Sequence, residues 1–340
     1  MTSDDVILIS GARHACNSPA TRPVRCRPVN APLHRRELPA QRCHVQGDGV
    51  RLQAYVWGKA DGPTLLLVHG YPDSHEIWLP LVSELAADYR ILAYDVRGHG
   101  ASQAPRRLRD YRLERLANDL EAVIRALSPQ QPVHLVAHDW GSIQSWEAVT
   151  EPRIQPLLAS YTSISGPCLD HVGHWMRQRI SLRSPGALRQ VLGQLLSSWY
   201  IALFHIPLLP ELCWRLGLDR AWPWLLRRVE GVHGLPPSST QRSDGMRGVQ
   251  LYRANFVRSL FSPRARSTRV PVQLIVPLAD RFVRPQLFDD LSHWAPTLTR
   301  RDVRGGHWRV LAEPKALAGW IREHVTRMQD DQGVSKPPAG

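Results

Sequence analysis

Short, largely apolar runs alternate with segments of helical periodicity between residues 39 and 328. Residues 64–69, Thr-Leu-Leu-Leu-Val-His, form such a run and end at Gly70, as buried parallel strands often do. Strands that alternate with helices predict an α/β fold, with a mostly parallel sheet between two layers of helices. The expected strands are 50–57, 64–69, 90–94, 133–138, 160–163 and 272–277, and the expected helices are 113–127, 141–149 and 316–324.

Residues 168–265 break this alternation. They are rich in Trp, Leu and Arg, have helical periodicity and contain no clear strand. We interpret them as a helical cap inserted over the carboxyl end of the sheet, where ligands bind in open α/β folds. The core is then expected in two parts, 39–167 and 266–328. A disordered arm, 1–38, and a disordered tail, 329–340, are expected outside it, because both lack an apolar period.

The charge of the chain is strongly basic, with a formal net charge of +13. Thirteen arginines and five acidic residues fall in the cap segment alone. Genome base composition can produce such an excess, but a basic surface also attracts phosphates, nucleic acid or anionic lipid. Zinc-finger spacing, RNA-binding signatures and the phosphate-binding loop motif are all missing from the sequence, so nucleic acid is not an expected partner.

Cysteine usage and the N-terminal sequence bear on the compartment. The five cysteines are odd in number and contain no C-x-x-C pair, which argues against a disulfide framework or a thiolate metal site and suits a reducing cytosol. The first residues lack the order of charge and hydrophobicity of a secretory signal, and no uninterrupted apolar stretch could span a bilayer. We therefore expect a cytoplasmic protein, either free or associated with a membrane surface.

The clearest chemical signal is Val-Ala-His-Asp-Trp-Gly-Ser at 136–142, where a buried strand turns into a helix. A nucleophile elbow needs small residues two positions before and after the nucleophile, and Ala137 and Gly141 satisfy this. Asp139 occupies the nucleophile position, which excludes serine-esterase chemistry and leaves a carboxylate that attacks carbon to give an alkyl-enzyme ester. The alternative is that Asp139 caps the following helix.

Five segments carry a family resemblance. Residues from about 42 to 328 resemble the epoxide hydrolase branch of the α/β-hydrolase superfamily. Within that branch they are most similar to the hydrolase half of mycobacterial-type proteins that fuse an epoxide hydrolase to a short-chain dehydrogenase. Ala137 stands where most of the wider family has glycine. The sequence also lacks the G-x-G-x-x-G motif of a dehydrogenase half. The matching segments are 69–74, 95–102, 138–142, 163–167 and 305–308.

The resemblance implies a base, an orienting acid and an oxyanion hole. His307, in Gly-Gly-His-Trp, would activate water against the ester, and Asp280, after the preceding strand, would fix its tautomer. Asp302 is nearer to His307 in sequence, but we interpret it as an ion-pair residue in a loop, and His69 as structural. The backbone N–H groups of Tyr71 and Trp140 would form the oxyanion hole.

Two cap tyrosines separate epoxide opening from halide displacement. The resemblance implies that Tyr200 and Tyr252 hydrogen-bond the epoxide oxygen, although either could instead be a packing residue. A dehalogenase would carry a donor side chain directly after His-Gly, where this chain has Tyr71, and only Trp140 remains as a halide ligand. We expect hydrolysis of a small apolar epoxide to a diol, without a metal or organic cofactor. A haloalkane dehalogenase and a catalytically inactive binding protein remain the alternatives.

The cap suggests one further partner. Residues 198–226 place four tryptophans among leucines and arginines. Most of these side chains should pack inside the cap, but a basic, tryptophan-rich surface could also rest on an anionic membrane and draw in lipid-derived epoxides. The sequence leaves open whether the chain is a monomer or a dimer.

Overall fold

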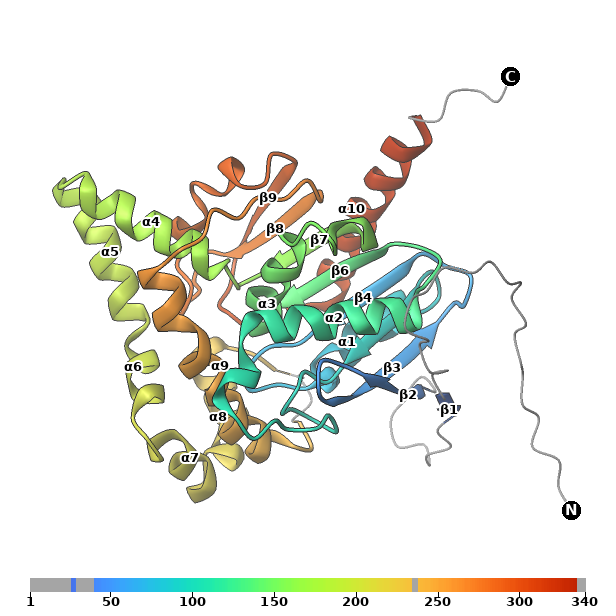
Figure 1. The fold of residues 1–340 in the computed structure, drawn as a ribbon, viewed down its shortest axis with the longest axis horizontal. Helices are drawn as coiled ribbons and strands as arrows, with labels where there is room; N and C mark the ends of the chain where they lie inside the picture. Colours follow the sequence, from blue (N-terminus) through green and yellow to red (C-terminus); the bar gives the residue numbers. More distant parts are fainter. Residues whose placement is uncertain (1–25, 29–39, 234–237, 335–340) are drawn as a thin grey trace, which may run out of the picture.

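The computed structural model describes residues 26–28, 40–233 and 238–334. Within these residues, nine strands form one sheet in the order β1-β2-β3-β5-β4-β6-β7-β8-β9. The strands from β5 to β9 run parallel, and β1, β2 and β3 extend the sheet by antiparallel pairing (Figure 1). Their bounds are β1 Cys26–Pro28, β2 Gln41–Gln46, β3 Arg51–Gly58, β4 Thr64–Val68, β5 Arg90–Tyr94, β6 Val133–His138, β7 Leu158–Ile164, β8 Val272–Pro277 and β9 Leu298–Val303.

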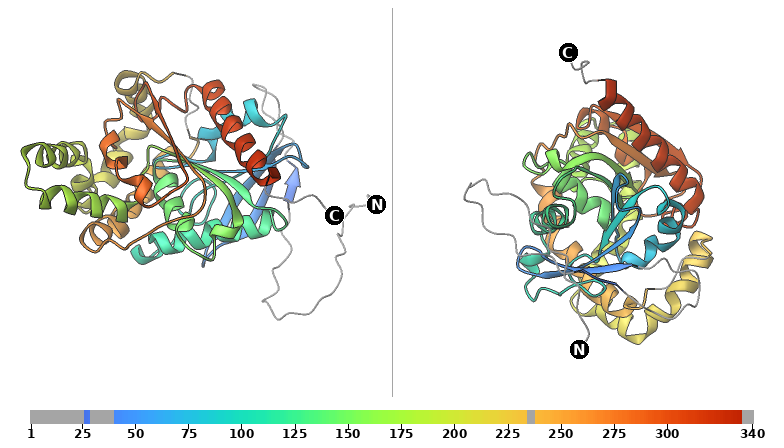
Figure 2. Two further views of the ribbon diagram at one scale, coloured as in Figure 1. Left: turned by 90° about the horizontal axis from the view of Figure 1, so that it is seen from above. Right: turned by 90° about the vertical axis from the view of Figure 1, so that its right-hand side faces the viewer.

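Helices cover both faces of the sheet. Seen from above, α10 lies on one side of the strands and α2 on the other (Figure 2). Short connections supply the 3-10 turns η1 His75–Trp78, η2 Leu108–Tyr111, η3 Gln155–Leu157, η5 Pro285–Phe288 and η6 Leu291–His293. The covering helices are α1 Leu79–Leu85, α2 Leu113–Leu127, α3 Trp140–Val149 and α10 Pro314–Val334.

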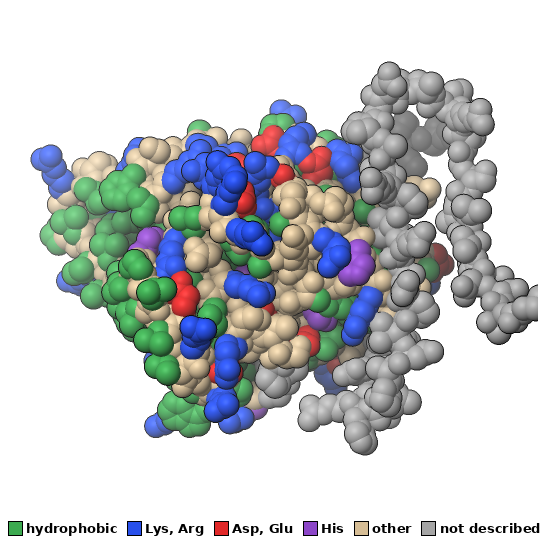
Figure 3. Space-filling view, turned by 60° about the horizontal axis from the view of Figure 1, so that its bottom comes forward, with side chains coloured by type: hydrophobic (Ala, Val, Ile, Leu, Met, Phe, Trp, Pro, Cys, Tyr) green, Lys and Arg blue, Asp and Glu red, His purple; other side chains and the backbone are tan. Residues whose placement is uncertain are grey.

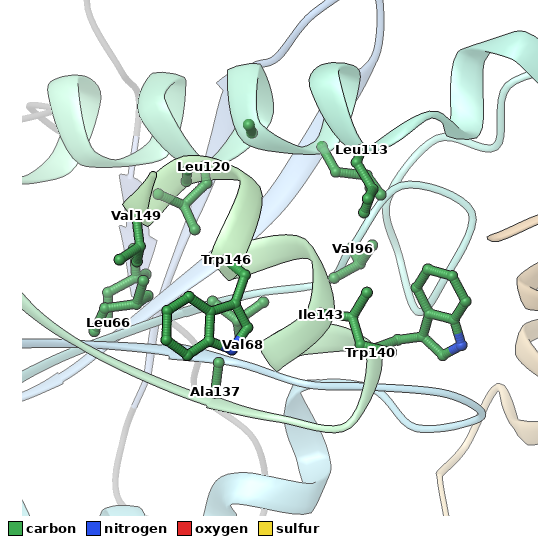
Figure 4. Packing of buried hydrophobic residues seen from close by; sticks show 14 of the residues in the cluster. Leu66, Val68, Val96, Leu113, Leu120, Ala137, Trp140, Ile143, Trp146 and Val149 are labelled. Carbon is green, nitrogen blue, oxygen red and sulfur yellow. The ribbon is translucent and has the colours of Figure 1, made fainter. Parts of the chain in front are cut away.

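The central strand β4 shows why its sequence is apolar throughout. Leu66 and Val68 belong to the core cluster beneath α2 and α3, whereas Leu65 and Leu67 belong to the cluster beneath α1 and α10. Alternate side chains of a strand point to opposite faces, so a strand covered on both faces is apolar at every position. Figure 4 shows the first cluster, in which Trp146 of α3 lies over the strands.

Among the described residues, the segment between β7 and β8 contains helices and connecting loops but no strand. It lies at one end of the sheet, at the left in Figure 1. Arg264, directly after the last of these helices, pairs with Asp170 at 2.8 Å and with Glu147 of α3 at 2.7 Å, which fixes both ends of the insertion to the core. The helices are α4 Leu169–Ser181, α5 Pro185–Ser197, α6 Trp199–His205, α7 Leu209–Cys213, the π-helical turn η4 Trp214–Leu218, α8 Asp219–Glu230 and α9 Gln241–Phe261.

The expected strands and helices are all present, with ends shifted by one or two residues except in the last helix, which ends at Val334 and not at 324, but helix α1 and three strands were missed. β9 reads Leu-Thr-Arg-Arg-Asp-Val and is only partly buried, and β2 is an antiparallel strand with exposed polar positions, so neither has an apolar run. β1 pairs with β2 inside the segment expected to be a disordered arm, which is wrong for residues 26–28. The remainder of that arm lies outside the described residues.

Two further expectations need correction. Helix α10 continues to Val334, so the boundary placed at 328 is too early, and only 335–340 of the expected tail lie outside the described residues. Cys43 is disulfide-bonded, contrary to the expectation from the cysteine count, whereas Cys168 and Cys213 are free. No single described helix is long and apolar enough to cross a bilayer. Trp199–His205 and Leu209–Glu230 meet the length and composition test only as a pair bent by 96°.

Candidate active site

Asp139 lies at the corner between β6 and α3. Its backbone has φ 54° and ψ −124°, a conformation that L-residues rarely adopt. The corner is tight because α3 starts against the neighbouring strand: a Cβ at Gly141 would overlap the carbonyl oxygen of Val68. In the described structure the Asp139 side chain makes no N-capping bond to α3, which argues against the capping alternative. The strained corner instead presents the carboxylate to the cavity.

The two carboxylate oxygens of Asp139 have different partners. Oδ1 accepts a hydrogen bond from the backbone N–H of Tyr71 at 2.7 Å, and Oδ2 lies 3.3 Å from Nε2 of His307. The N–H of Trp140, the first residue of α3, also acts on this carboxylate and lowers its pKa. The backbone N–H groups of Tyr71 and Trp140 thus both act on the Asp139 carboxylate, and Oδ2 faces the imidazole of His307.

His307 and Asp280 meet on the core side of the cavity. Nδ1 of His307 lies 2.8 Å from Oδ2 of Asp280, and Oδ1 of Asp280 accepts hydrogen bonds from the N–H groups of Phe282 and Val283 at 2.8 and 2.9 Å. Hydrogen bonds on both oxygens thus hold the acid that orients the imidazole. Asp302, the nearer acid in sequence, pairs instead with Arg300 at 2.8 Å, on strand β9 and not in a loop.

The protonation states of His307 and of the two aspartates beside it, Asp280 and Asp139, depend on one another. Burial alone would lower the pKa of His307, but the carboxylates of Asp280 and Asp139 outweigh it and raise that pKa well above its usual value. Burial would likewise raise the pKa of Asp139, yet its hydrogen bond and charge interaction with His307 lower it. The favoured state of the pair is an Asp139 carboxylate beside a His307 imidazolium.

Two other buried histidines have structural contacts. Nε2 of His138 donates to the backbone carbonyl of His307 at 3.0 Å, and burial lowers the pKa of His138 to about 4. His69 accepts from the N–H of Val96 at 2.9 Å and lies 2.9 Å from the carbonyl oxygen of Gly70 through its other ring nitrogen. His69 therefore holds the loop after β4, as expected from the sequence.

The cap supplies phenols to the same cavity. Tyr200 comes from α6 and Tyr252 from α9, and their ring centroids are 6.0 Å apart in an edge-to-face contact. Tyr252 also packs on Trp140, with ring centroids 4.8 Å apart. Burial, followed for Tyr200 by the charge of Asp139, raises the pKa of both phenols, so they stay neutral and able to donate. The structure brings together all seven residues named from the sequence.

Tyr71 joins the core side to the cap side. Its backbone N–H binds Asp139, while its phenol donates to the carbonyl oxygen of Gly245 at 3.0 Å and accepts from Nε1 of Trp214 at 2.8 Å. Gly245 and Trp214 belong to the cap helix α9 and to η4. One residue therefore contacts the candidate nucleophile and the cap together.

The cavity between core and cap has a volume of about 570 Å³. Asp139 and His307 lie on its wall with Tyr200 and Tyr252, and the other lining side chains are almost all aromatic or aliphatic. A cavity of this size and polarity suits a small apolar ligand held by a few polar groups. Among the described residues, no group of three or more His, Cys, Asp or Glu side chains is arranged to hold a metal ion.

Two carboxyl groups at the site were not singled out from the sequence. Asp73 is buried and accepts from Nε1 of Trp308 at 3.0 Å, and burial raises its pKa to about 7. Glu230, at the end of α8, lines the cavity, and burial raises the pKa of its carboxyl group although the imidazole charge of His307 and the backbone N–H groups of His307 and Trp308 act in the opposite direction. Asp73 falls within a segment that matched the family. Glu230 follows two arginines and a valine and carries no sequence signal.

Known proteins resemble this chain over most of its length. A family model described as the alpha/beta hydrolase fold matches residues 63–192. An AB hydrolase superfamily protein, YfhM of Bacillus subtilis, is 31% identical over 293 residues, which cover 83% of this chain and 96% of that protein. The chain belongs to the α/β-hydrolase superfamily.

Two further relatives carry different names, one of an oxidoreductase and one of an epoxide hydrolase. The protein named "Probable oxidoreductase EphD" from Mycobacterium tuberculosis is 39% identical over 286 residues, or 81% of this chain, but the chain spans only 48% of its length. "Epoxide hydrolase 3" of Xenopus tropicalis is 26% identical over 301 residues, covering 83% of this chain and 76% of that protein. The family resemblance inferred from the sequence is thus confirmed.

Solved structures confirm the fold. An epoxide hydrolase from Bacillus megaterium, crystallised in a mutant form with its diol product, aligns with a TM-score of 0.70 at 20% identity, over 83% of this chain and 99% of that one. Epoxide hydrolase VrEH1 from Vigna radiata aligns with a TM-score of 0.67 at 21% identity, over 85% and 98%. At these identities the likeness shows the α/β-hydrolase fold alone.

Proposed function

We propose that this protein is an epoxide hydrolase that opens a small apolar epoxide through a covalent ester at Asp139. The observation that carries the proposal is a carboxylate at a nucleophile elbow that lines the same cavity as two neutral phenols. Opening an unactivated epoxide creates an alkoxide, which a phenol can bind and protonate. The names of the relatives, including "Epoxide hydrolase 3", support the same reaction class.

The first step forms the ester. Oδ2 of Asp139 attacks a ring carbon, the ring C–O bond breaks, and the leaving oxygen takes the proton of Tyr200 or Tyr252. The phenol regains its proton at the expense of the His307 imidazolium, which becomes neutral. This transfer becomes favourable because the Asp139 charge disappears into the ester, and that charge is one reason why the pKa of His307 is raised.

The second step hydrolyses the ester. Neutral His307, oriented by Asp280, takes one proton from water through Nε2, and the hydroxide adds to the ester carbon of Asp139. The negative charge then develops on Oδ1, where the N–H groups of Tyr71 and Trp140 stabilise it. Collapse breaks the bond to the diol oxygen and regenerates the Asp139 carboxylate and the His307 imidazolium. Of the two water protons, one ends on the diol and the other on His307.

Oxygen-isotope labelling tests this route directly. A single turnover with excess enzyme in oxygen-18 water should place the label in the peptide that contains Asp139 and leave the diol unlabelled. His307→Gln should stop after the first step and add the mass of the substrate to that peptide. Asp139→Ala should lose turnover of styrene oxide and of long-chain epoxides. Label in the diol during the first turnover would contradict the covalent route.

The surface acid Asp302 provides a matched control. Asp302→Ala removes a carboxylate that lies outside the cavity lining and should leave turnover within about twofold of wild type. If both aspartate variants hydrolyse epoxides equally, the assignment of Asp139 fails.

A haloalkane dehalogenase remains the alternative for an aspartate nucleophile. It requires N–H side-chain donors that face the cavity and hold the halide. The indole of Trp140, which the sequence leaves as the halide ligand, is buried and is not among the side chains that line the described cavity. Halide release from short bromoalkanes at a rate above epoxide turnover would favour this alternative. Loss of both activities in a folded protein would favour an inactive binding protein.

A further inference from the structure

The outer face of the cap is unusually apolar for a protein surface. Six large side chains from α5, α6, η4, α8 and the turn before α7 are between 56% and 78% exposed. Monomeric proteins rarely expose large contiguous apolar patches, and such patches often mark interaction sites. Figure 3 shows hydrophobic side chains gathered at the left of the molecule, the end at which Figure 1 places the cap helices. We call this surface the apolar cap face; its exposed residues are Leu192, Leu196, Trp199, Leu208, Leu216 and Trp224.

In helix α5 the exposed apolar side chains do not follow from the usual amphipathic pattern of a surface helix. Its inward positions include Ala187 and Val191, which are buried. Its outward positions include Leu192 and Leu196, with exposed fractions of 57% and 64%. A surface helix that packs on one side normally carries polar residues on the other. Apolar residues on the outward side therefore indicate that another apolar surface, from a partner molecule or a membrane, covers them.

The apolar cap face is continuous with the mouth of the cavity. Four side chains line the cavity and are also exposed: Trp199 and Leu203 of α6, Leu209 of α7 and Val229 of α8. An apolar molecule that lies against this face can therefore reach Asp139 between these helices. Whatever covers the face also covers the entrance.

Exposed arginines accompany the apolar residues. On α8, Arg220, Trp224 and Arg228 follow one another at intervals of four residues and form one exposed stripe, while Trp222 and Leu226 point to the cavity. Amphipathic elements that combine aromatic and basic side chains in this way bind at the headgroup level of anionic membranes. Eight exposed cap arginines form no ion pair among the described residues: Arg177, Arg183, Arg189, Arg215, Arg220, Arg227, Arg228 and Arg247.

We propose that the apolar cap face docks on the surface of an anionic phospholipid bilayer and receives lipophilic substrate directly from it. The charge favours a bilayer over a second copy of this chain, because a symmetric contact through this face would bring the unpaired arginines of two copies together. The delivery of substrate rests on the proposed function. The docking itself does not.

Vesicle flotation tests the docking with the full chain. Wild-type protein should float with vesicles that contain about one third anionic phospholipid and much less with purely zwitterionic vesicles. Arg215→Gln/Arg220→Gln/Arg228→Gln should weaken binding about 100-fold, at about fivefold for each arginine near an anionic surface. Arg301→Gln/Arg322→Gln/Arg327→Gln makes the same change in net charge on β9 and α10 and should bind more tightly than the cap variant. Equal binding by both triple variants, or no binding by wild type, would overturn the proposal.

The apolar residues are tested separately. Leu196→Gln/Leu216→Gln alters two exposed side chains outside the cavity lining and should weaken vesicle binding about tenfold. Leu108→Gln, an exposed leucine on η2 outside the cap, should bind as wild type does. Binding of the double variant at the wild-type level would overturn the proposal. So would a dimeric wild type that becomes monomeric with these substitutions and does not bind vesicles.

Activity separates this proposal from the proposed function. The Leu196→Gln/Leu216→Gln variant should turn over water-soluble styrene oxide at the wild-type rate and lose about tenfold on a long-chain epoxide embedded in vesicles. A protein that floats with anionic vesicles but turns over neither substrate would retain the docking and refute the epoxide hydrolase assignment. Equal turnover of the embedded epoxide by wild type and variant would refute delivery from the bilayer.

Discussion

The two walls of the cavity are built in different ways. On the core wall, Asp139, His307 and Asp280 are held by hydrogen bonds between 2.7 and 2.9 Å and by one contact of 3.3 Å, most of them anchored to backbone atoms at strand ends. On the cap wall, Tyr200 and Tyr252 are held mainly by ring contacts with neighbouring aromatic side chains. Directional bonds to backbone fix an atom more closely than ring contacts do. We therefore expect core substitutions to stop a chemical step and cap substitutions to slow one.

The largest effect is expected from Asp280→Asn on the core wall. Oδ1 would keep its two backbone donors, so the amide NH₂ would face Nδ1 of His307 and favour the tautomer that cannot accept a proton at Nε2. Ester hydrolysis should slow about 10,000-fold, while ester formation persists. Rapid-quench mass spectrometry would show the ester accumulating. Equal slowing of both steps would contradict the orienting role.

Removing one phenol from the cap wall should have a smaller effect. Tyr200→Phe and Tyr252→Phe each delete one donor to the alkoxide and should slow ester formation about 100-fold, or about 3 kcal/mol. Ester hydrolysis should be unchanged, because the phenols do not contact the attacking water in the proposed route. Single-turnover kinetics would separate the two steps. Tyr89→Phe, on the far face of the core, should leave both rates unchanged.

One methyl group inside the cap can displace Trp214, which donates to Tyr71 of the core wall. A Cβ at Gly245 of α9 would overlap the indole ring of Trp214, which is 1% exposed. Gly245→Ala should destabilise the protein by about 3 kcal/mol, as overpacking does. Gly319→Ala on α10 meets open space and should be neutral or slightly stabilising through helix propensity. Thermal unfolding compares the two variants, and equal melting temperatures would contradict a tight cap contact.

The smallest expected effect concerns the pH dependence of stability. Asp73 has a folded pKa of about 7 against a reference of 3.8, so the native state favours its protonated form. The stability from this group is complete below pH 3.8, declines as the pH rises and is lost above pH 7. Asp73→Asn cannot ionise, so its advantage over wild type should grow between pH 5 and pH 8 by about 2 to 3 kcal/mol. A melting-temperature difference that is the same at both pH values would contradict this.

The fold was predictable where buried positions form a regular pattern along a short stretch of sequence. The strand at 64–68 is apolar at almost every position because helices cover both of its faces, and the elbow at 137–141 requires small residues by geometry. β9 could not be found in this way, since an edge strand with Arg300 and Asp302 carries no apolar run. The cap was predicted as helical, but the expectation that most of its tryptophans pack inside fails for Trp199 and Trp224, which are 64% and 56% exposed.

The residues of the candidate site that belong to sequence motifs were predictable. Asp139, His307 and Asp280 follow strands whose carboxyl ends meet at one edge, so their proximity follows from topology. Asp73 and Glu230 could not be identified, because their burial depends on contacts with residues far along the chain. Trp308, which donates to Asp73, is 235 positions away. A sequence shows that an acid exists, but not which later segment encloses it.

The double attachment of Tyr71 constrains how ligands leave. Lifting the whole cap would strip the buried phenol of both its partners, Gly245 and Trp214, and would disturb the residue whose N–H holds Asp139. Exchange past the exposed lining residues of α6, α7 and α8 would leave all three hydrogen bonds intact. Asp139, the proposed nucleophile, would then stay aligned between turnovers while only exposed side chains move.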